Sequence, residues 1–313
     1  MYLSDSERDE IEILWSKGYS MRSIAKVFGR SPNTISYELG RAPNGYKASN
    51  AKIYARTKLK NRRLQWSKIE AEPELKRYVI DSLKQNWNPD EISGRMKREK
   101  NPWYISKSAI YQWLETVRGE RYKKYLYAYR PGRRHKKKDG LHGQLSHMTP
   151  IERRMPGAGN RTRYGHWESD CIVSRRGTRG GLSTHIERKS RLLVAQKVSD
   201  LSSHEKQKTL QTLSEVFSVK SITFDRGHEN ARHHELGIPT YFCNAYSSFE
   251  KGSVENANKM IRRFFPKKTD FTLISQKEID HIVSIINNKP RKILKYRTSL
   301  EVARDGGVIH RVS

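Results

Sequence analysis

Apolar residues recur at helical spacing in three short segments at the start of the chain. Ser4 and Glu7 have the spacing of a capping box, and the amphipathic segment after them ends at Gly18. A second helix is expected after Ser20, and the Ser31-Pro32 pair favours a third with proline at its first position. Three short helices with a tight turn between the last two are typical of a helix-turn-helix, whose third helix enters the DNA major groove. The base-facing positions of that helix would be Asn33, Thr34, Ser36 and Tyr37.

A second group of amphipathic helices follows the first. Residues 75–83 form one helix, the Asn-Pro-Asp segment at 88–90 begins another, and Ser106 caps a third. The pattern predicts a second helix-turn-helix, although Trp103 and Tyr104 lengthen its loop and weaken the signal. A helical packing or dimerisation module is the alternative here, and a three-helix bundle without DNA contacts is the alternative for the first group. The last helix of the second group would expose Lys107, Ser108 and Tyr111 at its leading end.

Two basic segments connect these helices to the rest of the chain. Residues 46–68 are compatible with a helix, and residues 121–160 are rich in Tyr, Arg and Lys and contain turn signals. Such segments bind phosphates without specifying sequence, and a solvated linker helix is the alternative for the first of them. The expected domains are a helix-turn-helix domain (1–45), a basic linker helix (46–68), a second helix-turn-helix domain (69–120), a basic linker (121–160) and a catalytic domain (161–313).

The C-terminal half changes to short β-prone runs. Three runs, at about 168–175, 182–188 and 191–198, precede an amphipathic helix at 202–217. Two more runs follow, and then helices with one apolar face. Strands that alternate with helices in this way predict an α/β domain.

Three acidic residues of this half are candidates for a metal site. Asp225 follows a predicted strand, Asp170 lies in a strand-like segment, and Glu255 lies in a predicted helix. Carboxylates far apart in the sequence can converge on two Mg²⁺ ions, which prefer oxygen ligands and catalyse phosphoryl transfer. Arg262 is seven residues after Glu255, on the same side of the helix, where it could hold a phosphate. From spacing alone, solvated surface charges explain the three acidic residues better.

The motifs around these residues resemble a known family. GHWESD, FDRG and GSVENANKMIRRFFPKKTDF stand in the order found in DDE transposases of the insertion sequence 30 family of bacterial mobile elements. The resemblance covers nearly the whole chain and implies a ribonuclease H-like catalytic domain with a mixed five-stranded sheet. It also implies that Asp170, Asp225 and Glu255 form the catalytic triad and bind the metal, with Lys259 and Arg262 on the scissile or flanking phosphate.

The resemblance further implies an activity and its partners. The protein would bind the terminal inverted repeats of an insertion sequence, cleave a strand at each end with two Mg²⁺ ions, and transfer the freed 3′-hydroxyl; Mn²⁺ is the expected substitute metal. Pairing of two ends favours a homodimer or larger assembly on double-stranded DNA. Ser169 replaces the family's usual glycine, and the gap from Asp225 to Glu255 is shorter than the common one. A sequence-specific DNA-binding regulator that keeps this fold without catalysis is the alternative.

Other polar residues nearby have different expected roles. Glu168 would point the same way as Asp170 from an extended strand, and a structural role is favoured for it. Four histidines lack a zinc spacing, and a site for polynucleotidyl transfer requires hard oxygen donors. Turn, surface or DNA-contact roles are therefore expected for His166, His228, His233 and His234.

Composition supports a nucleic-acid partner. Lys and Arg number 62 against 33 acidic residues, and the net charge of +29 opposes compaction unless a polyanion is bound. A basic RNA-binding protein would share this charge, but the chain lacks aromatic RNA-recognition motifs. The two cysteines, Cys171 and Cys243, favour neither a disulfide framework nor a zinc site. With no apolar signal or membrane-spanning segment, the expected location is the bacterial cytoplasm, in association with the nucleoid.

Overall fold

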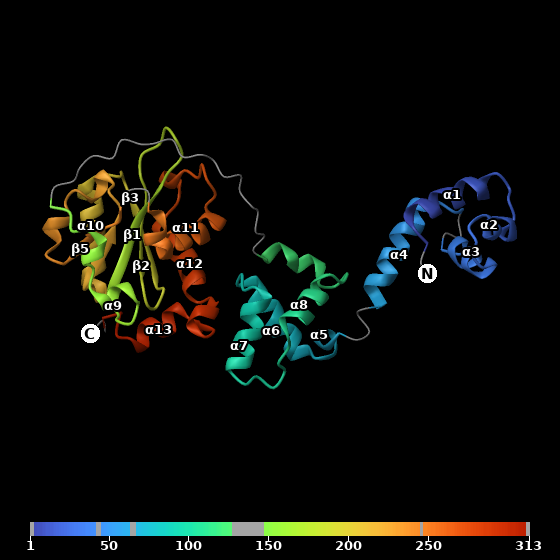
Figure 1. The fold of residues 1–313 in the computed structure, drawn as a ribbon, viewed down its shortest axis with the longest axis horizontal. Coiled ribbons are helices and arrows are strands. Elements are labelled where there is room, and N and C mark those ends of the chain that lie inside the picture. Colours follow the sequence, from blue (N-terminus) through green and yellow to red (C-terminus); the bar gives the residue numbers. More distant parts are fainter. Residues whose placement is uncertain (1–2, 42–44, 63–66, 127–146, 245–246, 311–313) are drawn as a thin grey trace. The chain divides into compact units, whose positions relative to one another are not determined.

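The computed structural model describes residues 3–41, 45–62, 67–126, 147–244 and 247–310. By their internal contacts the residues group into two compact units, Met1–Leu83 with Trp103–Leu126 and Lys84–Pro102 with Tyr127–Ser313. The helices of the first unit are α1 (Asp5–Ser16), α2 (Met21–Val27), α3 (Pro32–Leu39), α4 (Ala48–Arg62), α5 (Lys68–Ala71), α6 (Pro73–Lys84) and α8 (Lys107–Leu114) (Figure 1).

The first three helices form as the sequence predicts. Ser4 caps α1, because its Oγ accepts the backbone N–H of Glu7 while the Glu7 carboxylate accepts the backbone N–H of Ser4. Ser20 and Ser31 each accept a backbone N–H at the starts of α2 and α3. The N-terminal helix-turn-helix has a core of its own, which includes Ile11, Ile24, Ala25, Ile35, Tyr46 and Ala51.

Trp113 connects α8 with α5 in the first unit. Its buried indole donates a hydrogen bond to Glu70 (Nε1 to Oε1, 2.8 Å) and stacks on Tyr122, with ring centroids 5.6 Å apart. Tyr122 lies in the 3₁₀ helix η2 (Glu120–Tyr125). The Glu70 carboxylate also accepts from Lys76 and Arg118, so one acidic side chain connects α5 with α6, α8 and the turn after it.

Helix α7 (Pro89–Arg98) belongs to the second unit. Arg95 forms two hydrogen bonds with Glu301, at 2.7 and 2.8 Å. Gly94 permits close packing, since a Cβ atom there would lie 2.2 Å from the ring of Tyr296. The sequence predicts this helix as the middle one of a second helix-turn-helix at 69–120. All three predicted helices are present. By their contacts, α6 and α8 belong to the first unit, whereas α7 belongs to the second. The domain boundaries remain predictions.

A mixed five-stranded sheet forms the centre of the second unit, in the order β3-β2-β1-β4-β5. Strand β2 is antiparallel to both of its neighbours, whereas β1, β4 and β5 are parallel. Helices α11 and α12 cover one face and α10 the other (Figure 1). This arrangement is ribonuclease H-like, which confirms the predicted fold class. The strands are β1 (His166–Val173), β2 (Gly181–Glu187), β3 (Leu193–Val198), β4 (Ser221–Phe224) and β5 (Thr240–Phe242), and the helices are α10 (Ser203–Val216), α11 (Gly252–Phe264), α12 (Gln276–Asn287) and α13 (Ser299–Asp305).

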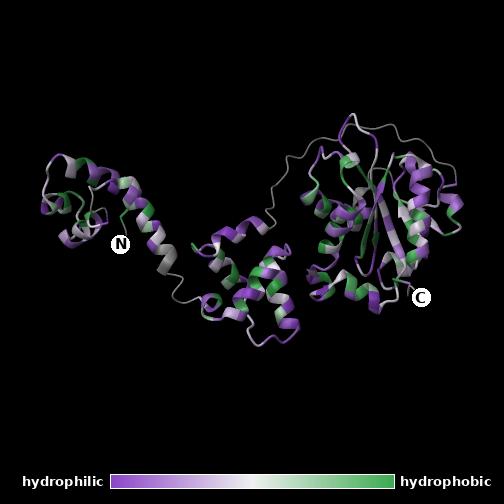
Figure 2. Ribbon diagram, turned by 180° about the vertical axis from the view of Figure 1, so that it is seen from behind, coloured by the Kyte–Doolittle hydropathy of each residue, from purple (hydrophilic) through white to green (hydrophobic). Residues whose placement is uncertain are grey.

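Two apolar cores hold the layers together. One packs Ile172, Leu182 and Ile186 of the sheet against α11 and α12, and the other packs Trp167 and Phe224 against α10 and α13. Figure 2 shows hydrophobic residues along the strands and hydrophilic ones on the outer parts of the helices. The sequence does not predict the short helix α9 (Pro156–Gly159) or the two-stranded hairpin of β6 (Pro290–Arg291) and β7 (Arg297–Thr298). Among the described residues, no helix has the length and apolarity needed to cross a membrane.

Candidate active site

Asp170 lies on β1, and Asp225 directly follows β4, the parallel strand beside it. Glu168 of β1 is in register with Thr223 of β4, and each aspartate comes two residues after one member of this pair. Adjacent strands are about 4.8 Å apart, and residues two apart point to the same face. The sheet therefore brings the two carboxylates side by side at the C-terminal end of β4, the strand end at which the sequence predicts Asp225.

A lysine lies between the two aspartates. The Nζ atom of Lys251 is 2.8 Å from Oδ2 of Asp225 and 3.3 Å from Oδ1 of Asp170, and the lysine side chain is only 6% exposed. Burial by itself lowers the pKa of Lys251, but the two aspartates outweigh it and raise the pKa above its usual value. Burial raises the pKa of Asp225, but Lys251 more than offsets that effect. Lys251 thus favours the ionised form of Asp225 and lies within ion-pair distance of both carboxylates.

Two asparagines complete the polar shell of the aspartates. Asn258 of α11 donates to Oδ2 of Asp170 at 2.8 Å, and Asn230 donates to Oδ1 of Asp225 at 3.1 Å. Asn230 lies in the 3₁₀ helix η4 (His228–Asn230). Each aspartate therefore has one oxygen on Lys251 and the other on an amide, which fixes the rotation of its carboxylate.

Glu168 holds the helix that carries Glu255. Its side chain is fully buried, and its Oε2 accepts the backbone N–H groups of Ser253 and Val254, each at 2.9 Å, in the first turn of α11. Lys251, the residue before the helix, makes no such cap with its own side chain. The other oxygen of Glu168 accepts from Arg188 at 2.6 Å. The structural role predicted for Glu168 is confirmed, and the helix is fixed to the strand that carries Asp170.

Glu255 lies on the face of α11 that is turned toward Asp170. Lys251, four residues before it, and Asn258, three residues after it, both contact the Asp170 carboxylate, and residues at these spacings share one side of a helix. Glu255 is half-buried and has no hydrogen bond or ion pair among the described residues. The structured part of the chain contains no group of three acidic, histidine or cysteine side chains close enough to bind one metal ion. Two of the three predicted ligands are thus together, and the third is on the adjoining helix face.

The donor set nevertheless fits a hard divalent cation. Carboxylate oxygens of Asp170 and Asp225 already converge on one buried positive charge, the Lys251 ammonium. Mg²⁺ and Mn²⁺ prefer oxygen donors of this kind and usually keep several waters. A cation near these oxygens would compete with Lys251 for them.

A buried polar cluster contacts β1 on the face of the sheet that α10 covers. Lys206 of α10 donates to the backbone carbonyl of Asp170 and to Ser183 Oγ, both at 3.0 Å. His185 lies between Ser169 and Ser183, with 3.0 Å to each hydroxyl, and burial keeps its pKa well below the usual value. Ser169, which replaces the glycine usual in the resembling family, is therefore a hydrogen-bonding member of this cluster.

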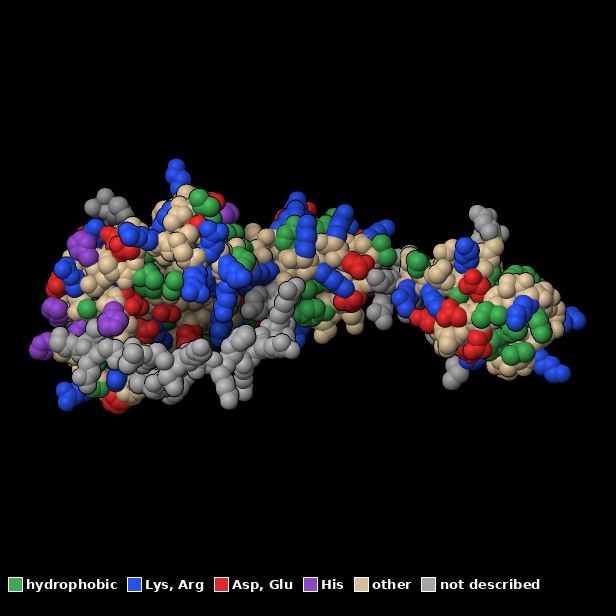
Figure 3. Space-filling model, turned by 90° about the horizontal axis from the view of Figure 1, so that it is seen from above, with side chains coloured by type: hydrophobic (Ala, Val, Ile, Leu, Met, Phe, Trp, Pro, Cys, Tyr) green, Lys and Arg blue, Asp and Glu red, His purple; other side chains and the backbone are tan. Residues whose placement is uncertain are grey.

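The predicted phosphate-binding residues differ in their surroundings. Arg262 donates to the backbone carbonyls of Val173 and Pro266, at 2.9 and 3.1 Å, and its guanidinium lies over the Phe271 ring. It thereby ties the end of α11 to the end of β1. Lys259 is exposed and lines a cavity on another side of α11. Figure 3 shows Lys and Arg side chains gathered beside acidic side chains on one face of the second unit.

The predicted DNA-contact residues lie at the surface. In α3, Asn33, Ser36 and Tyr37 are exposed and Thr34 is half-buried, while Ile35 is buried. Tyr37 accepts a hydrogen bond from Lys58 of α4, whose ammonium also lies 4.9 Å from the tyrosine ring centre. In α8 the predicted contacts Lys107, Ser108 and Tyr111 are all exposed.

Sequence reasoning missed Lys251, Asn258 and Asn230. The first two could have been found by extending the helical spacing from Glu255 in both directions. Asn230 follows a turn and has no periodic signal. Of the candidate histidines, His166 and His233 are buried and each bonds a hydroxyl, of Ser221 and Thr240 respectively.

Comparison with known proteins places this geometry in context. A family model described as "Helix-turn-helix domain" matches residues 1–42. The transposase InsI for insertion sequence element IS30A of Escherichia coli K12 is 34% identical over 326 residues, covering 97% of this chain and 84% of that protein. The transposase for IS1086 of Cupriavidus metallidurans is 32% identical, covering 96% and 93%. A crystal structure of the catalytic core domain of BIV integrase aligns with 45% of this chain and 94% of its own, at a TM-score of 0.35 and 17% identity.

Replacement of Glu168 by glutamine is expected to destabilise the second unit. Glu168→Gln leaves Arg188 buried without a charged partner and weakens the cap of α11, and breaking a buried ion pair typically costs about 3–5 kcal/mol. Denaturant unfolding of the purified chain measures the loss. Glu215→Gln, an exposed change of the same charge, should stay within about 0.5 kcal/mol of the unsubstituted protein. Equal stability of the two variants would contradict the role given to Glu168.

Proposed function

The chain belongs to the insertion sequence 30 (IS30) family of transposases, and we propose that it cleaves and joins DNA through a metal-dependent DDE site. In this proposal Asp170, Asp225 and Glu255 are the catalytic carboxylates. The observation that carries it is the pairing of the two aspartates around one buried cation, beside the helix face that presents Glu255. Solvated surface charges, the alternative for these residues, would have no reason to converge in this way.

The residues of the site would share the work as follows. Two Mg²⁺ ions, or Mn²⁺ in their place, would activate the attacking oxygen and stabilise the leaving oxygen of a phosphodiester. Asn258 and Asn230 orient the aspartates, and Glu168 holds α11 in place beside them. Lys251 holds the carboxylates together without metal and would be free to approach the phosphate once they bind one. Lys259 and Arg262 are the proposed contacts of the flanking phosphates.

The N-terminal helices would recognise the ends of the element. The matched helix-turn-helix, the net charge of +29 and the exposed polar residues of α3 support binding of terminal inverted repeats. We propose Asn33, Thr34, Ser36 and Tyr37 as the contacts of the first reading helix, and Lys107, Ser108 and Tyr111 as those of the second. Two ends must be paired for transposition, so a homodimer or larger assembly on double-stranded DNA is proposed. The domain limits 1–45, 69–120 and 161–313 are part of the same proposal.

Replacement of Asp225 should separate binding from chemistry. Asp225→Asn is expected to bind duplex DNA with the inverted repeats that flank the gene as the original protein does, and to lose Mg²⁺-dependent nicking by at least about a hundredfold. Gel-shift and nicking assays measure the two properties. Asp280→Asn, an exposed change of the same charge, is the control. Specific binding without nicking by the original protein would identify a DNA-binding regulator instead.

Removal of the Lys251 charge should strengthen metal binding. Because the ammonium and a divalent cation compete for the same oxygens, Lys251→Met is expected to bind Mn²⁺ roughly tenfold more tightly. Electron paramagnetic resonance of free Mn²⁺ gives the affinity without any need for activity. The metal-free variant should also unfold at a lower temperature, because two carboxylates then repel each other. Lys267→Met, on an exposed site, is the control, and unchanged Mn²⁺ affinity in Lys251→Met would contradict the competition.

A further inference from the structure

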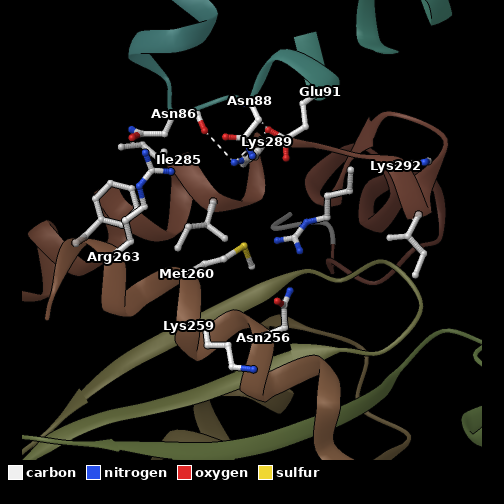
Figure 4. Close-up of a pocket in the computed structure, with 14 residues that line it drawn as sticks. Asn86, Asn88, Glu91, Asn256, Lys259, Met260, Arg263, Ile285, Lys289 and Lys292 are labelled. Atoms are coloured by element: carbon white, nitrogen blue, oxygen red, sulfur yellow. Dashed lines mark hydrogen bonds and ion pairs between the residues drawn. The ribbon is translucent and has the colours of Figure 1, made fainter. Parts of the chain in front are cut away.

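A cavity of about 290 Å³ lies between α11 and the end of α12, and its lining includes Met260, Phe264 and Ile286, which also belong to the apolar core on this face of the sheet or pack against it. Residues from three stretches of the second unit surround it: α11, the end of α12 with the segment after it, and the segment that leads into α7 (Figure 4). Its volume is near the lower end of small-molecule pockets, about 300–1,000 Å³. The cavity can hold a single small group and is too small for a DNA duplex.

The charges around the cavity are strongly unbalanced. Five cationic side chains line it, against the single carboxylate of Glu91. That carboxylate is already engaged, since its Oε2 lies 3.1 Å from the Nζ atom of Lys289. The four other cationic residues are Lys259, Arg263, Arg291 and Lys292. An anion entering the cavity would therefore meet an excess of positive charge.

Arg291 gives the clearest sign of a missing anion. Its Nε and Nη2 atoms are buried and have no hydrogen-bond partner among the described residues. Burial, with a contribution from Arg191, lowers the pKa of the guanidinium to about 10. A buried cation without a partner is costly, and such groups are normally paired. A phosphate oxygen would supply the acceptor that this side chain lacks.

The rest of the wall consists of apolar residues and three asparagines, Asn86, Asn88 and Asn256. Met260, Phe264 and Ile285 line the cavity, and Ile293, which is 67% exposed, lies at its rim. A ligand that fits both the cationic and the apolar residues of the wall carries a phosphate and a flat, weakly polar group. A nucleotide has both, and bases pack against apolar and aromatic side chains in single-stranded DNA sites.

The position of the cavity relates it to the DDE site. Lys259 is four residues after Glu255 on α11, which corresponds to about 6 Å along the helix axis. Phosphates of one DNA strand are spaced about 3.4 Å along a duplex axis, so a strand that leaves the catalytic carboxylates and passes around α11 would reach the cavity after several nucleotides. Only an unpaired nucleotide would leave the duplex to enter it.

We propose that this cavity binds one unpaired nucleotide of the strand next to the scissile phosphate, with its phosphate on Arg291 and its base against Met260 and Ile285. This assignment rests on the proposed function and adds a substrate feature, namely local melting of the DNA at the site of cleavage. In this proposal Arg291 and Ile293 contribute to binding of the unpaired nucleotide and take no part in the chemistry at the carboxylates.

Binding without metal tests the proposal independently of catalysis. Fluorescence anisotropy in EDTA would compare a duplex carrying the flanking inverted repeat with the same duplex bearing a two-nucleotide unpaired flap. The full-length protein is expected to bind the flap duplex about tenfold more tightly, in line with stacking of one base. Absence of any preference in the unsubstituted protein would overturn the proposal.

Two variants and one control test whether the preference for the flap duplex depends on the cavity. Arg291→Gln and Ile293→Glu should each remove it and leave affinity for the paired duplex unchanged, and Ile293 is exposed enough for its variant to fold. Lys267→Gln, which lies outside the cavity, should keep the preference. Retention of the full preference in both cavity variants would overturn the proposal.

An abasic flap tests the apolar wall separately. It retains the phosphates and should lose most of the preference, whereas equal binding of abasic and normal flaps would refute the placement of the base. Mg²⁺-dependent nicking is measured in parallel. If nicking fails while the flap preference and its loss in the variants are observed, the proposed catalysis is wrong and the nucleotide site stands.

Discussion

The buried carboxylate of Glu168 is the interaction on which the geometry of the site depends. One side chain accepts two backbone N–H groups of α11 and an Arg188 N–H, so a desolvated charge is matched by three donors. The same strand presents Asp170 two residues later, about 6.6 Å along the chain. Residues 168–170 of β1 therefore determine the distance between the start of α11 and Asp170. No loop contributes to this distance.

Lys251 offsets the electrostatic repulsion between Asp170 and Asp225. Parallel pairing of β1 and β4 places two aspartates side by side, and like charges at such a distance repel unless a cation separates them. The lysine is the last residue of the 3₁₀ helix η6 (Ser248–Lys251), two residues before Ser253, the first backbone N–H group that Glu168 caps. Lys206 holds the backbone of Asp170 from the opposite face of the sheet. Strand β1 is thus fixed from both sides by buried positive charge.

The sequence predicts most of the fold because its elements follow local rules. Serine caps and apolar periodicity identify the helices of the first unit, and β-prone runs identify the five strands within a few residues. The pairing of Asp170 with Asp225 was foreseen from their order and from the resemblance. The roles of Lys251, Asn230 and the Arg291 cavity were not, because each depends on contacts between residues distant in sequence. The same reason explains why α7 groups with the second unit, since its partners Tyr296 and Glu301 lie about 200 residues away.

The assignment of α7 also bears on how such a protein can change in evolution. The chain passes from one unit to the other three times, after Leu83, after Pro102 and after Leu126. A single recombination event that replaced everything before residue 127 would bring in a foreign α7, without the arginine and glycine that fit Glu301 and Tyr296. Lineages that acquire new recognition helices by gene fusion would therefore tolerate exchange of the first helices more readily than exchange of the region around α7.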